Sequence, residues 1–459
     1  MINGYEVSRG IGIGIAYVPE ESTLFEAEEG NSRAFLSGLK PGSVLVAGNL
    51  SPAVMSLLRD SSLAGIVCVT GGMTSHSALI ARSFGIPAVY GAGMATELIH
   101  HGDTVIVDGT LGYVYERPEP ALVSEFSERR KHFLKDRAEL ERFRSLKTVM
   151  ADGSSAEISC NVNDIFGVMN AIDNGAEGIG LLRTENLFSD MKSAPGEEEQ
   201  FRSYMRVAKA MDGHPVIIRT LDIGGDKMLP YMNMEQECNP FLGYRAIRYS
   251  LGNREFFATQ LRALLRAASY GNVSILLPMV TCIEEIREVK SLIHEIKTDL
   301  RDEGATFDDD IRIGAMIETP AAAMIADMLA GECDFFSIGT NDLVQYTMCA
   351  DRGNSRLAYL QSVMQPPVLR LISGTIESAK HAGIPVSVCG EAAADPLMIP
   401  VLAGMGCRNF SVDPFFVPEV RRTLSEWTAE DAENLARDVL KMTSGAEIKE
   451  YLKKQKAGS

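Results

Sequence analysis

The sequence predicts an α/β protein that combines a small α/β domain, a helical linker and a (β/α)8 barrel. Three observations lead to this prediction. Residues 149–459 contain eight short apolar runs that alternate with helical stretches, residues 1–117 contain shorter β-like runs separated by turn residues, and residues 118–148 between them are dense in charge. Continuous apolar strands with helices between them indicate a parallel sheet buried on both faces, and eight such strands fit a TIM barrel.

The first domain is predicted from short runs bounded by turn residues. The expected strands cover residues 8–18, 42–47, 65–69, 87–90 and 102–115. Gly10, Gly12 and Gly14 stand in the first run, and no helical stretch follows them directly. A glycine-rich strand therefore accounts for them better than a dinucleotide-binding loop, which needs a helix after its glycines.

The linker is expected to be one long, solvated helix. Residues 124–144 contain neither glycine nor proline, and their apolar positions are sparse. A helix of about 30 residues over 118–147 would be up to ~45 Å long, which suits it to separate two domains.

The barrel is predicted from eight strand candidates in the last two thirds of the chain. They cover residues 156–162, 178–183, 215–222, 274–280, 312–318, 335–339, 385–391 and 409–413.

A histidine stands at the expected start of a helix in the first domain. A β-branched run at residues 63–69 is followed by a glycine turn and by a helical stretch over residues 75–84, so His76 lies on the first helical turn. Free N–H groups and the positive end of the helix dipole disfavour an imidazolium there and favour a bound phosphate. A neutral imidazole is a nucleophile and is suited to accept a phosphoryl group. Alternatively, Thr74 and Ser75 only cap the helix, and His76 has no chemical role.

Polar residues follow the predicted barrel strands, at the end where active sites of such barrels form. Arg183, Arg219, Arg245 and Arg352 are expected at this rim, together with Asn341. Arginines that face one cleft repel each other unless an anion lies between them, and their guanidinium groups match phosphate and carboxylate. The rim is therefore expected to bind an anion.

Two carboxylates and a thiol complete the expected rim. Glu318 and Asp342 follow strands five and six, and Cys389 lies at the end of strand seven. Taken one at a time, these residues have a purely structural explanation. An Arg–Asp pair at a surface contributes under ~1 kcal/mol to folding stability, and a buried cysteine is usually inert. Converging on one rim with the arginines, the carboxylates supply hard oxygen ligands for Mg²⁺. The set indicates a doubly anionic substrate bound with a divalent metal.

The overall charge excludes two classes of partner. The net charge of -17 argues against nucleic acid and against an anionic membrane surface, because both select clusters of Lys and Arg. No apolar run approaches the ~20 residues of a membrane span, and the first residues lack the basic start of a signal peptide. We therefore expect a cytoplasmic protein without membrane insertion.

Five segments carry a family resemblance. They read Gly-Ala-Glu-Gly-Ile-Gly-Leu-Leu-Arg-Thr-Glu at 175–185, Ile-Ile-Arg-Thr-Leu-Asp-Ile-Gly-Gly-Asp-Lys at 217–227, Asn-Pro-Phe-Leu-Gly-Tyr-Arg at 239–245, Ile-Glu-Thr-Pro-Ala-Ala-Ala at 317–323 and Phe-Phe-Ser-Ile-Gly-Thr-Asn-Asp-Leu at 335–343. Together they resemble enzyme I of the bacterial phosphoenolpyruvate-dependent sugar phosphotransferase system. The resemblance runs from the histidine segment through the barrel. It implies a swivelling phosphohistidine domain joined to a phosphoenolpyruvate-binding TIM barrel.

The resemblance also implies an activity and a role for each site residue. Enzyme I moves the phosphoryl group of phosphoenolpyruvate (PEP) onto a histidine and then to a small phosphocarrier protein, and it forms a dimer through the barrel. By resemblance, His76 is the phosphoryl acceptor, Glu318 and Asp342 hold Mg²⁺, and Cys389 is the acid that protonates the enolate to pyruvate. The residues implied in PEP binding are Arg183, Arg219, Arg245, Asn341, Asp342 and Arg352.

One departure from the family keeps alternatives open. Enzyme I carries a helical subdomain that docks the phosphocarrier, and only residues 19–43 occupy its place here. The receiver of the phosphoryl group is therefore open. A second reading is a split relative of pyruvate phosphate dikinase or PEP synthase that works with a nucleotide-binding domain on another chain. A third is a regulatory protein that senses PEP without turnover, which would need neither His76 nor Cys389.

Overall fold

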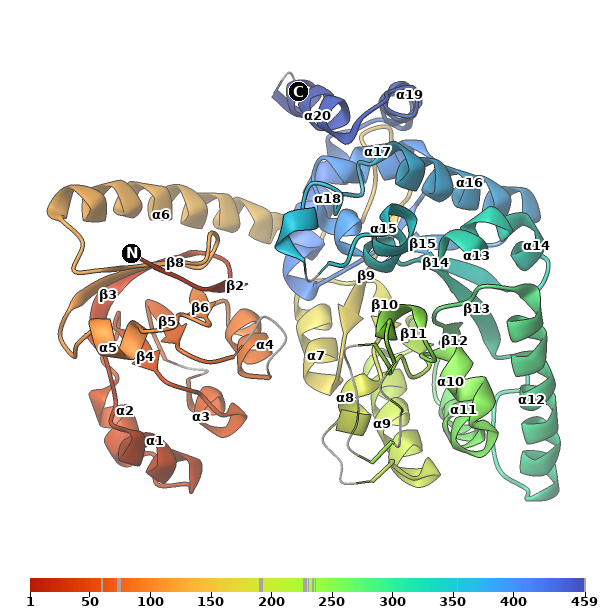
Figure 1. Cartoon of the computed structure of the whole chain (residues 1–459), viewed down its shortest axis with the longest axis horizontal. Helices are drawn as coiled ribbons and strands as arrows, with labels where there is room; N and C mark the ends of the chain where they lie inside the picture. The colour runs from red at the N-terminus through yellow and green to blue at the C-terminus, as the bar shows by residue number, and fades with distance from the viewer. Residues whose placement is uncertain are drawn as a thin grey trace. The chain divides into compact units, whose positions relative to one another are not determined.

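The computed structural model divides the chain into two compact units, which are described separately. They comprise Met1–Glu141 and Arg142–Ser459 (Figure 1). The structure describes residues 1–58, 61–71, 76–189, 193–225, 229, 231, 232, 235, 237–352 and 354–457. The linker helix belongs to the first unit, and the domain limits expected at residues 117 and 148 stay predictions.

The first unit is built on one mixed sheet. Among its described residues the strand order is β1-β8-β7-β3-β4-β5-β6-β2, with parallel pairing from β3 through β6. The strands are β1 (Ile2–Asn3), β2 (Tyr5–Ser8), β3 (Ile11–Tyr17), β4 (Val44–Ala47), β5 (Gly65–Cys68), β6 (Ala88–Tyr90), β7 (Thr104–Asp108) and β8 (Tyr113–Glu116). The helices are α1 (Glu21–Glu28), α2 (Arg33–Gly38), α3 (Pro52–Leu57), α4 (His76–Ser83), α5 (Ala95–Leu98) and α6 (Pro120–Leu140).

Glycines explain two differences from the expected strands. The run over residues 102–115 is an antiparallel pair, β7 and β8, because the chain turns at Gly112 with a φ of 73°. Gly10, with a φ of 131°, separates β2 from β3. Gly12 and Gly14 lie within β3, where an added Cβ would stand 2.2 Å from the carbonyl oxygen of Ala64 and 2.0 Å from that of Gly42. The glycine-rich segment is therefore a closely packed strand, as expected.

The linker helix is shorter than expected and is partly packed. α6 has 21 residues, about 32 Å at 1.5 Å per residue, and a 3-10 turn, Glu141–Phe143, follows it. The expected length of ~45 Å is therefore wrong. Its charge-dense sequence does not keep it fully solvated, because Phe126 is buried against Ile11 and Ile106 of the sheet. Arg129 also pairs with the buried Asp108 at 3.0 Å.

The second unit is a closed barrel of parallel strands, as the eight apolar runs predict. Its strand order is β9-β10-β11-β12-β13-β14-β15-β16, and β16 pairs with β9 to close it. The strands are β9 (Glu157–Val162), β10 (Gly178–Leu182), β11 (Val216–Arg219), β12 (Val273–Leu277), β13 (Arg312–Ile317), β14 (Phe335–Ile338), β15 (Val386–Val388) and β16 (Asn409–Val412). Each begins or ends within a few residues of its expected limits.

Helices surround the barrel strands (Figure 1). They are α7 (Ile165–Asp173), α8 (Glu185–Ser189), α9 (Glu197–Ala210), α10 (Ile247–Gly252), α11 (Arg254–Ala268), α12 (Ile283–Asp302), α13 (Pro320–Met324), α14 (Ala326–Ala330), α15 (Thr340–Met348), α16 (Pro366–Ala382), α17 (Met398–Gly404), α18 (Val417–Ser425), α19 (Ala429–Val439) and α20 (Gly445–Ala457). Local sequence fixes several starts: Asp164 caps α7 and Thr319 caps α13 through side-chain hydrogen bonds, and Pro320 and Pro366 occupy first turns.

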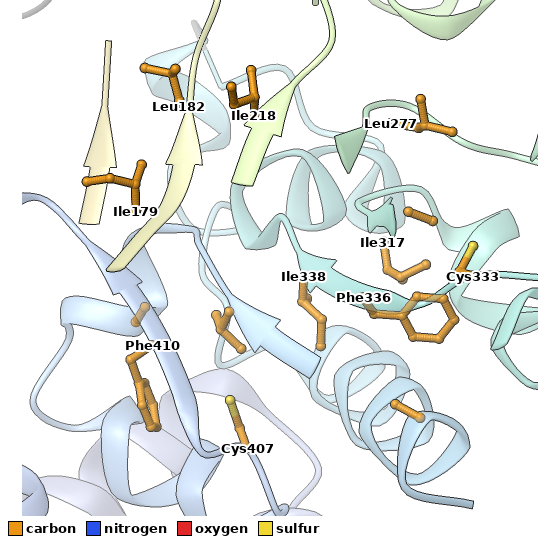
Figure 2. Packing of buried hydrophobic residues seen from close by; sticks show 14 of the residues in the cluster. Ile179, Leu182, Ile218, Leu277, Ile317, Cys333, Phe336, Ile338, Cys407 and Phe410 are labelled. Carbon is orange, nitrogen blue, oxygen red and sulfur yellow. The ribbon is translucent and has the colours of Figure 1, made fainter. Parts of the chain in front are cut away.

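Alternate residues of the barrel strands enter two different cores. The larger cluster joins the outer strand faces to the helices, and Figure 2 shows part of it, including Ile218, Phe336 and Ile338. The smaller cluster fills the interior of the barrel with Leu181, Leu276, Met316, Phe335 and Cys389. Because side chains on a strand point alternately to opposite faces, one short run serves both cores. Cys389 is thereby placed inside the barrel.

None of the helices in the described part of the chain is both long enough and apolar enough to cross a membrane.

Candidate active site at the barrel rim

The expected site residues of the second unit follow the barrel strands at one rim. The strands of a closed parallel barrel all end on the same face, so residues directly after them meet there. Arg219 ends β11, Arg183 follows β10, Glu318 follows β13, Asn341 and Asp342 begin α15 after β14, and Cys389 follows β15. Arg245 precedes α10, and Arg352 lies between α15 and α16.

Arg219 and Arg245 are held by one shared carboxylate, that of Asp222, and Arg219 also pairs with Glu185. Arg219 Nη2 pairs with Glu185, Arg219 Nη1 lies 3.1 Å from Asp222 Oδ2, and Arg245 Nη2 lies 2.8 Å from Asp222 Oδ1. All four side chains are buried. Burial alone would lower the pKa of Arg219, and the two carboxylates overcome this and raise the pKa above its ordinary value. Asp222 therefore fixes the two guanidinium groups relative to each other.

Arg183 has a different environment. Its Nη1 lies 3.5 Å from Asn163 Oδ1, and burial together with the neighbouring positive charge of Arg219 lowers its pKa. Like charges placed close together in a buried site favour a bound anion between them.

Arg352 is linked to Arg245 through an aromatic ring. The guanidinium carbons of Arg245 and Arg352 each lie 5.9 Å from the ring centre of Phe241. Arg245 Nη1 donates a hydrogen bond to the hydroxyl of Tyr346 at 3.1 Å, and that hydroxyl donates to the carbonyl of Phe241 at 2.5 Å. These contacts connect α15 to the loop before Arg245.

The two expected metal ligands lie in an acidic part of the rim. Burial and the nearby carboxylates of Asp342 and Asp222 raise the pKa of Glu318 to about 8. Glu318 Oε1 accepts a hydrogen bond from the N–H of Met279 at 2.7 Å. A Cβ added at Gly339 would stand 2.9 Å from Glu318 Oε2, so the glycine leaves room for the carboxylate.

These carboxylates fit a magnesium ion. Asp342 Oδ1 is buried and makes no hydrogen bond with the described residues. The charge of Asp342 adds to the cost of ionising Glu318, and a divalent cation would relieve this cost. The described residues contain no cluster of three or more His, Cys, Asp or Glu side chains in a metal-binding arrangement. Mg²⁺ often uses one or two carboxylates together with water and substrate phosphate, so two carboxylates are enough to hold it.

Cys389 is a buried thiol in the barrel interior. Its Sγ lies 3.6 Å from the carbonyl oxygen of Ile338, and its pKa is raised chiefly by burial. The thiol is therefore protonated at neutral pH and has a proton to give.

Asn341, in the segment after β14, is fixed by Glu391, in the segment after β15. Its Oδ1 accepts from the N–H of Glu391 at 3.0 Å, and its Nδ2 donates to Glu391 Oε1 at 3.3 Å. The loop after β14 is thus tied to the loop after Cys389.

His76 is the first residue of α4 in the first unit, as the sequence predicts. Residues 72–75 and the side chain of His76 lie outside the described part of the structure. The expected turn and cap before the histidine therefore stay predictions.

Comparison with known proteins identifies the family to which this chain belongs. Residues 137–429 match the family model of the PEP-utilising enzyme, PEP-binding domain, and residues 39–112 match that of the PEP-utilising enzyme, mobile domain. The chain belongs to the PEP-utilising enzymes.

Within that family the chain is enzyme I-like. It is 44% identical over 410 residues to the phosphoenolpyruvate-protein phosphotransferase of Staphylococcus carnosus, covering 88% of this chain and 71% of the relative. Its identity to the protein of the same name from Bacillus subtilis is 43%, covering 89% and 72%, and to that of Haemophilus influenzae 41%, covering 91% and 72%. The chain is thus shorter than these homologues.

Glu185 and Asp222 were not among the expected site residues, although both hold arginines at the rim. Each follows a buried strand within a few residues, and this position in the sequence was the signal that could have placed them at the rim. Sequence alone does not show which arginine a carboxylate will contact.

Proposed function

We propose that this protein transfers the phosphoryl group of PEP to His76, releases pyruvate, and then passes the phosphoryl group to an acceptor protein. The observation that supports this most directly is the rim itself. Arg219 and Arg245 are fixed by one carboxylate, Asp222, beside the acidic pair Glu318 and Asp342. Fixed cations next to a carboxylate pair suit a phosphate ester that binds with a divalent metal.

The arginines and Asn341 would bind the phosphate and carboxylate of PEP. Fixed positive groups stabilise the charge that develops on a phosphoryl group during transfer. Glu318 and Asp342 would hold Mg²⁺, which, when bound, supplies further positive charge at the phosphate oxygens.

The bonds change in two steps. A ring nitrogen of neutral His76 forms a bond to phosphorus while the bond from phosphorus to the enol oxygen breaks, which leaves the enolate of pyruvate. The Cys389 thiol then gives its proton to C3 of the enolate, forming a C–H bond and a thiolate that recovers a proton from water. The raised pKa of this thiol keeps it in the acid form that the second step needs.

The experiment is labelling with [³²P]PEP and Mg²⁺. The wild type should take up acid-labile, base-stable label, and His76→Ala should take up none. Persistent label in His76→Ala would make the assignment wrong. PEP binding without label in the wild type would favour the sensor hypothesis, and label that appears only with a nucleotide-binding partner chain would favour the split dikinase hypothesis.

The acceptor protein, the homodimer through the barrel and the cytoplasmic location belong to this proposal as expectations. The segment between β3 and β4 holds only two short helices, α1 and α2. Their small size is the reason to test the usual phosphocarrier directly.

A further inference from the structure

The backbone of Cys389 leaves the barrel ladder directly before the rim. β15 pairs with β14 and β16 only as far as Val388. The N–H of Cys389 still donates to the carbonyl of Ile338 at 3.1 Å. Its carbonyl lies one residue past the last β15–β16 pair, Val388 with Phe410, and the chain bends at Gly390. The N–H and Sγ of Cys389 both face the carbonyl of Ile338, so a partner for the Cys389 carbonyl fixes the other side of this residue.

Asn161 holds this carbonyl from β9, which is separated from β15 only by β16. Asn161 is part of β9, and its Nδ2 donates to the carbonyl oxygen of Cys389 at 2.9 Å and to that of Ser411 at 3.1 Å. Two residues separated from Asn161 by more than 200 positions in sequence are thus joined by one amide. The bond closes the gap that the short β15 leaves.

The orientation of this amide is also fixed. The hydroxyl of Ser411, fully buried in β16, donates to Asn161 Oδ1 at 2.7 Å. Reversing the amide would turn its oxygen toward two carbonyl oxygens, which is unfavourable because none of them can donate. Every polar atom of the Asn161 side chain therefore has a defined partner, and the side chain has one stable arrangement.

The surrounding barrel leaves this cluster little space. A Cβ added at Gly180 of β10 would stand 2.3 Å from Ser411 Oγ and 3.0 Å from the Cβ of Ser159. A glycine at this position lets the Asn161–Ser411 pair fit between the strands. The pair is thus a packed feature of the barrel interior.

We infer that Asn161 is a positioning residue for Cys389, which it holds in place for proton delivery to the substrate. The inference rests on the proposed function, in which Cys389 is the acid. The hydrogen bonds of the Asn161 side chain go to the Cys389 backbone and to Ser411, so its loss should slow protonation while leaving the arginines and the metal ligands in place. A general acid misplaced by about 1 Å loses on the order of 100-fold in rate.

The first test is the rate of pyruvate formation in a single turnover of the full chain with Mg²⁺ and varied PEP, which needs no acceptor protein. Its limiting rate and its half-saturating PEP concentration are called kcat and KM here. Asn161→Ala should lower kcat about 10- to 100-fold, keep KM for PEP within about twofold, and raise the solvent deuterium isotope effect on kcat. Ser411→Ala, which removes only the donor that orients the amide, should show a smaller change in the same direction. Ser411→Ala also tests the inference if Asn161→Ala does not fold.

Ser387→Ala is the matched control. Ser387 belongs to β15, the strand directly before Cys389, and is also buried, but its hydroxyl contacts the carbonyl of Phe336 at 3.4 Å. It should leave kcat and the isotope effect unchanged. An equal fall in kcat for the control and for Asn161→Ala, or a rise in KM with kcat unchanged, would overturn the inference.

A second readout does not depend on the proposed function. The rate at which iodoacetamide alkylates Cys389, followed by peptide mass spectrometry, should rise at least about tenfold in Asn161→Ala because the thiol is no longer held in its buried position. It should not rise in Ser387→Ala. If the wild type formed no pyruvate, the proposed function would fall, and this rate would still decide whether Asn161 positions Cys389. An unchanged alkylation rate would reject the inference.

Discussion

Glu318 Oε1 accepts a hydrogen bond from the backbone N–H of Met279 at 2.7 Å, and Met279 donates it with a φ of 57°. A non-glycine residue rarely adopts this left-handed conformation. Met279 follows β12 and Glu318 follows β13, and these two strands pair in parallel. One oxygen of the carboxylate is therefore fixed by the neighbouring loop, while the other lies close to Gly339.

Gly339→Ala should weaken Mg²⁺ binding. The added Cβ would stand 2.9 Å from both the Cβ and the Oε2 atom of Glu318, so the carboxylate has to move. The backbone at Gly339 has a φ of -86°, which alanine adopts without strain. Overpacking of this kind costs ~1–3 kcal/mol, and we expect about that loss in the free energy of Mg²⁺ binding measured by calorimetry with PEP present.

Gly374→Ala in α16 is the control for that variant. An added Cβ there meets no described atom within 4 Å. Because alanine favours the helix interior, this variant should be as stable as the wild type or more stable by ~0.5–1 kcal/mol. Unchanged Mg²⁺ binding in Gly339→Ala would count against Glu318 as a metal ligand.

Asp222→Asn should weaken PEP binding and lower stability together. The change removes the charge that pairs with both Arg219 and Arg245, and breaking a buried ion pair costs ~3–5 kcal/mol of folding free energy. Urea unfolding would measure stability, and calorimetry would measure PEP affinity. Glu197→Gln removes a partly exposed partner of Arg262 and Arg266 and should change stability by under ~1 kcal/mol without affecting PEP. Equal PEP affinity in both variants would refute the role given to Asp222.

The metal-free protein should lose stability as the pH rises from about 5 to 8. The pKa of Glu318 is raised from 4.5 to about 8 in the folded state, so over this range the folded protein holds a proton that the unfolded chain has released. The expected loss is on the order of a few kcal/mol, since one pKa unit is worth ~1.4 kcal/mol. Thermal unfolding in chelator at several pH values would measure it.

Two comparisons sharpen this pH experiment. Glu318→Gln should flatten the dependence because the amide does not titrate. Added Mg²⁺ should stabilise the wild type more at pH 8 than at pH 5, because the cation binds the ionised carboxylate. A slope that persists in Glu318→Gln would assign the titration to another group.

Phosphoryl transfer to a sugar-system phosphocarrier should be slow or absent. Residues 19–43 contain only α1 and α2, in place of the helical subdomain by which enzyme I docks that carrier. We would measure transfer from the phosphorylated protein to purified phosphocarrier, beside a full-length enzyme I. Transfer as fast as in that control would show that the missing subdomain is not needed for recognition.

The sequence was sufficient to predict the barrel and that several charged residues stand directly after its strands. Most of the eight strands were readable as short apolar runs buried on both faces, whereas β9 alternates buried with half-buried residues; both patterns are local. The same locality placed Arg219, Glu318 and Cys389 at strand ends, since parallel strands of a barrel end together. The sequence showed only sparse apolar positions in α6 and did not reveal that Phe126 packs on the sheet, with Leu122 and Val123 in the same cluster.

The tertiary structure alone decided which side chains touch. Asp222 contacts both Arg219 and Arg245, and Asn161 of β9 reaches past β16 to Cys389. The polar residues of β9, Ser159 and Asn161, alternate with apolar ones, which signals an inward face but not a partner. Those contacts depend on strand register and on the closure of the barrel between β9 and β16, which are set by packing between residues distant in sequence. The local sequence pattern therefore determined which helices and strands form, and the closure of the barrel determined which side chains contact each other.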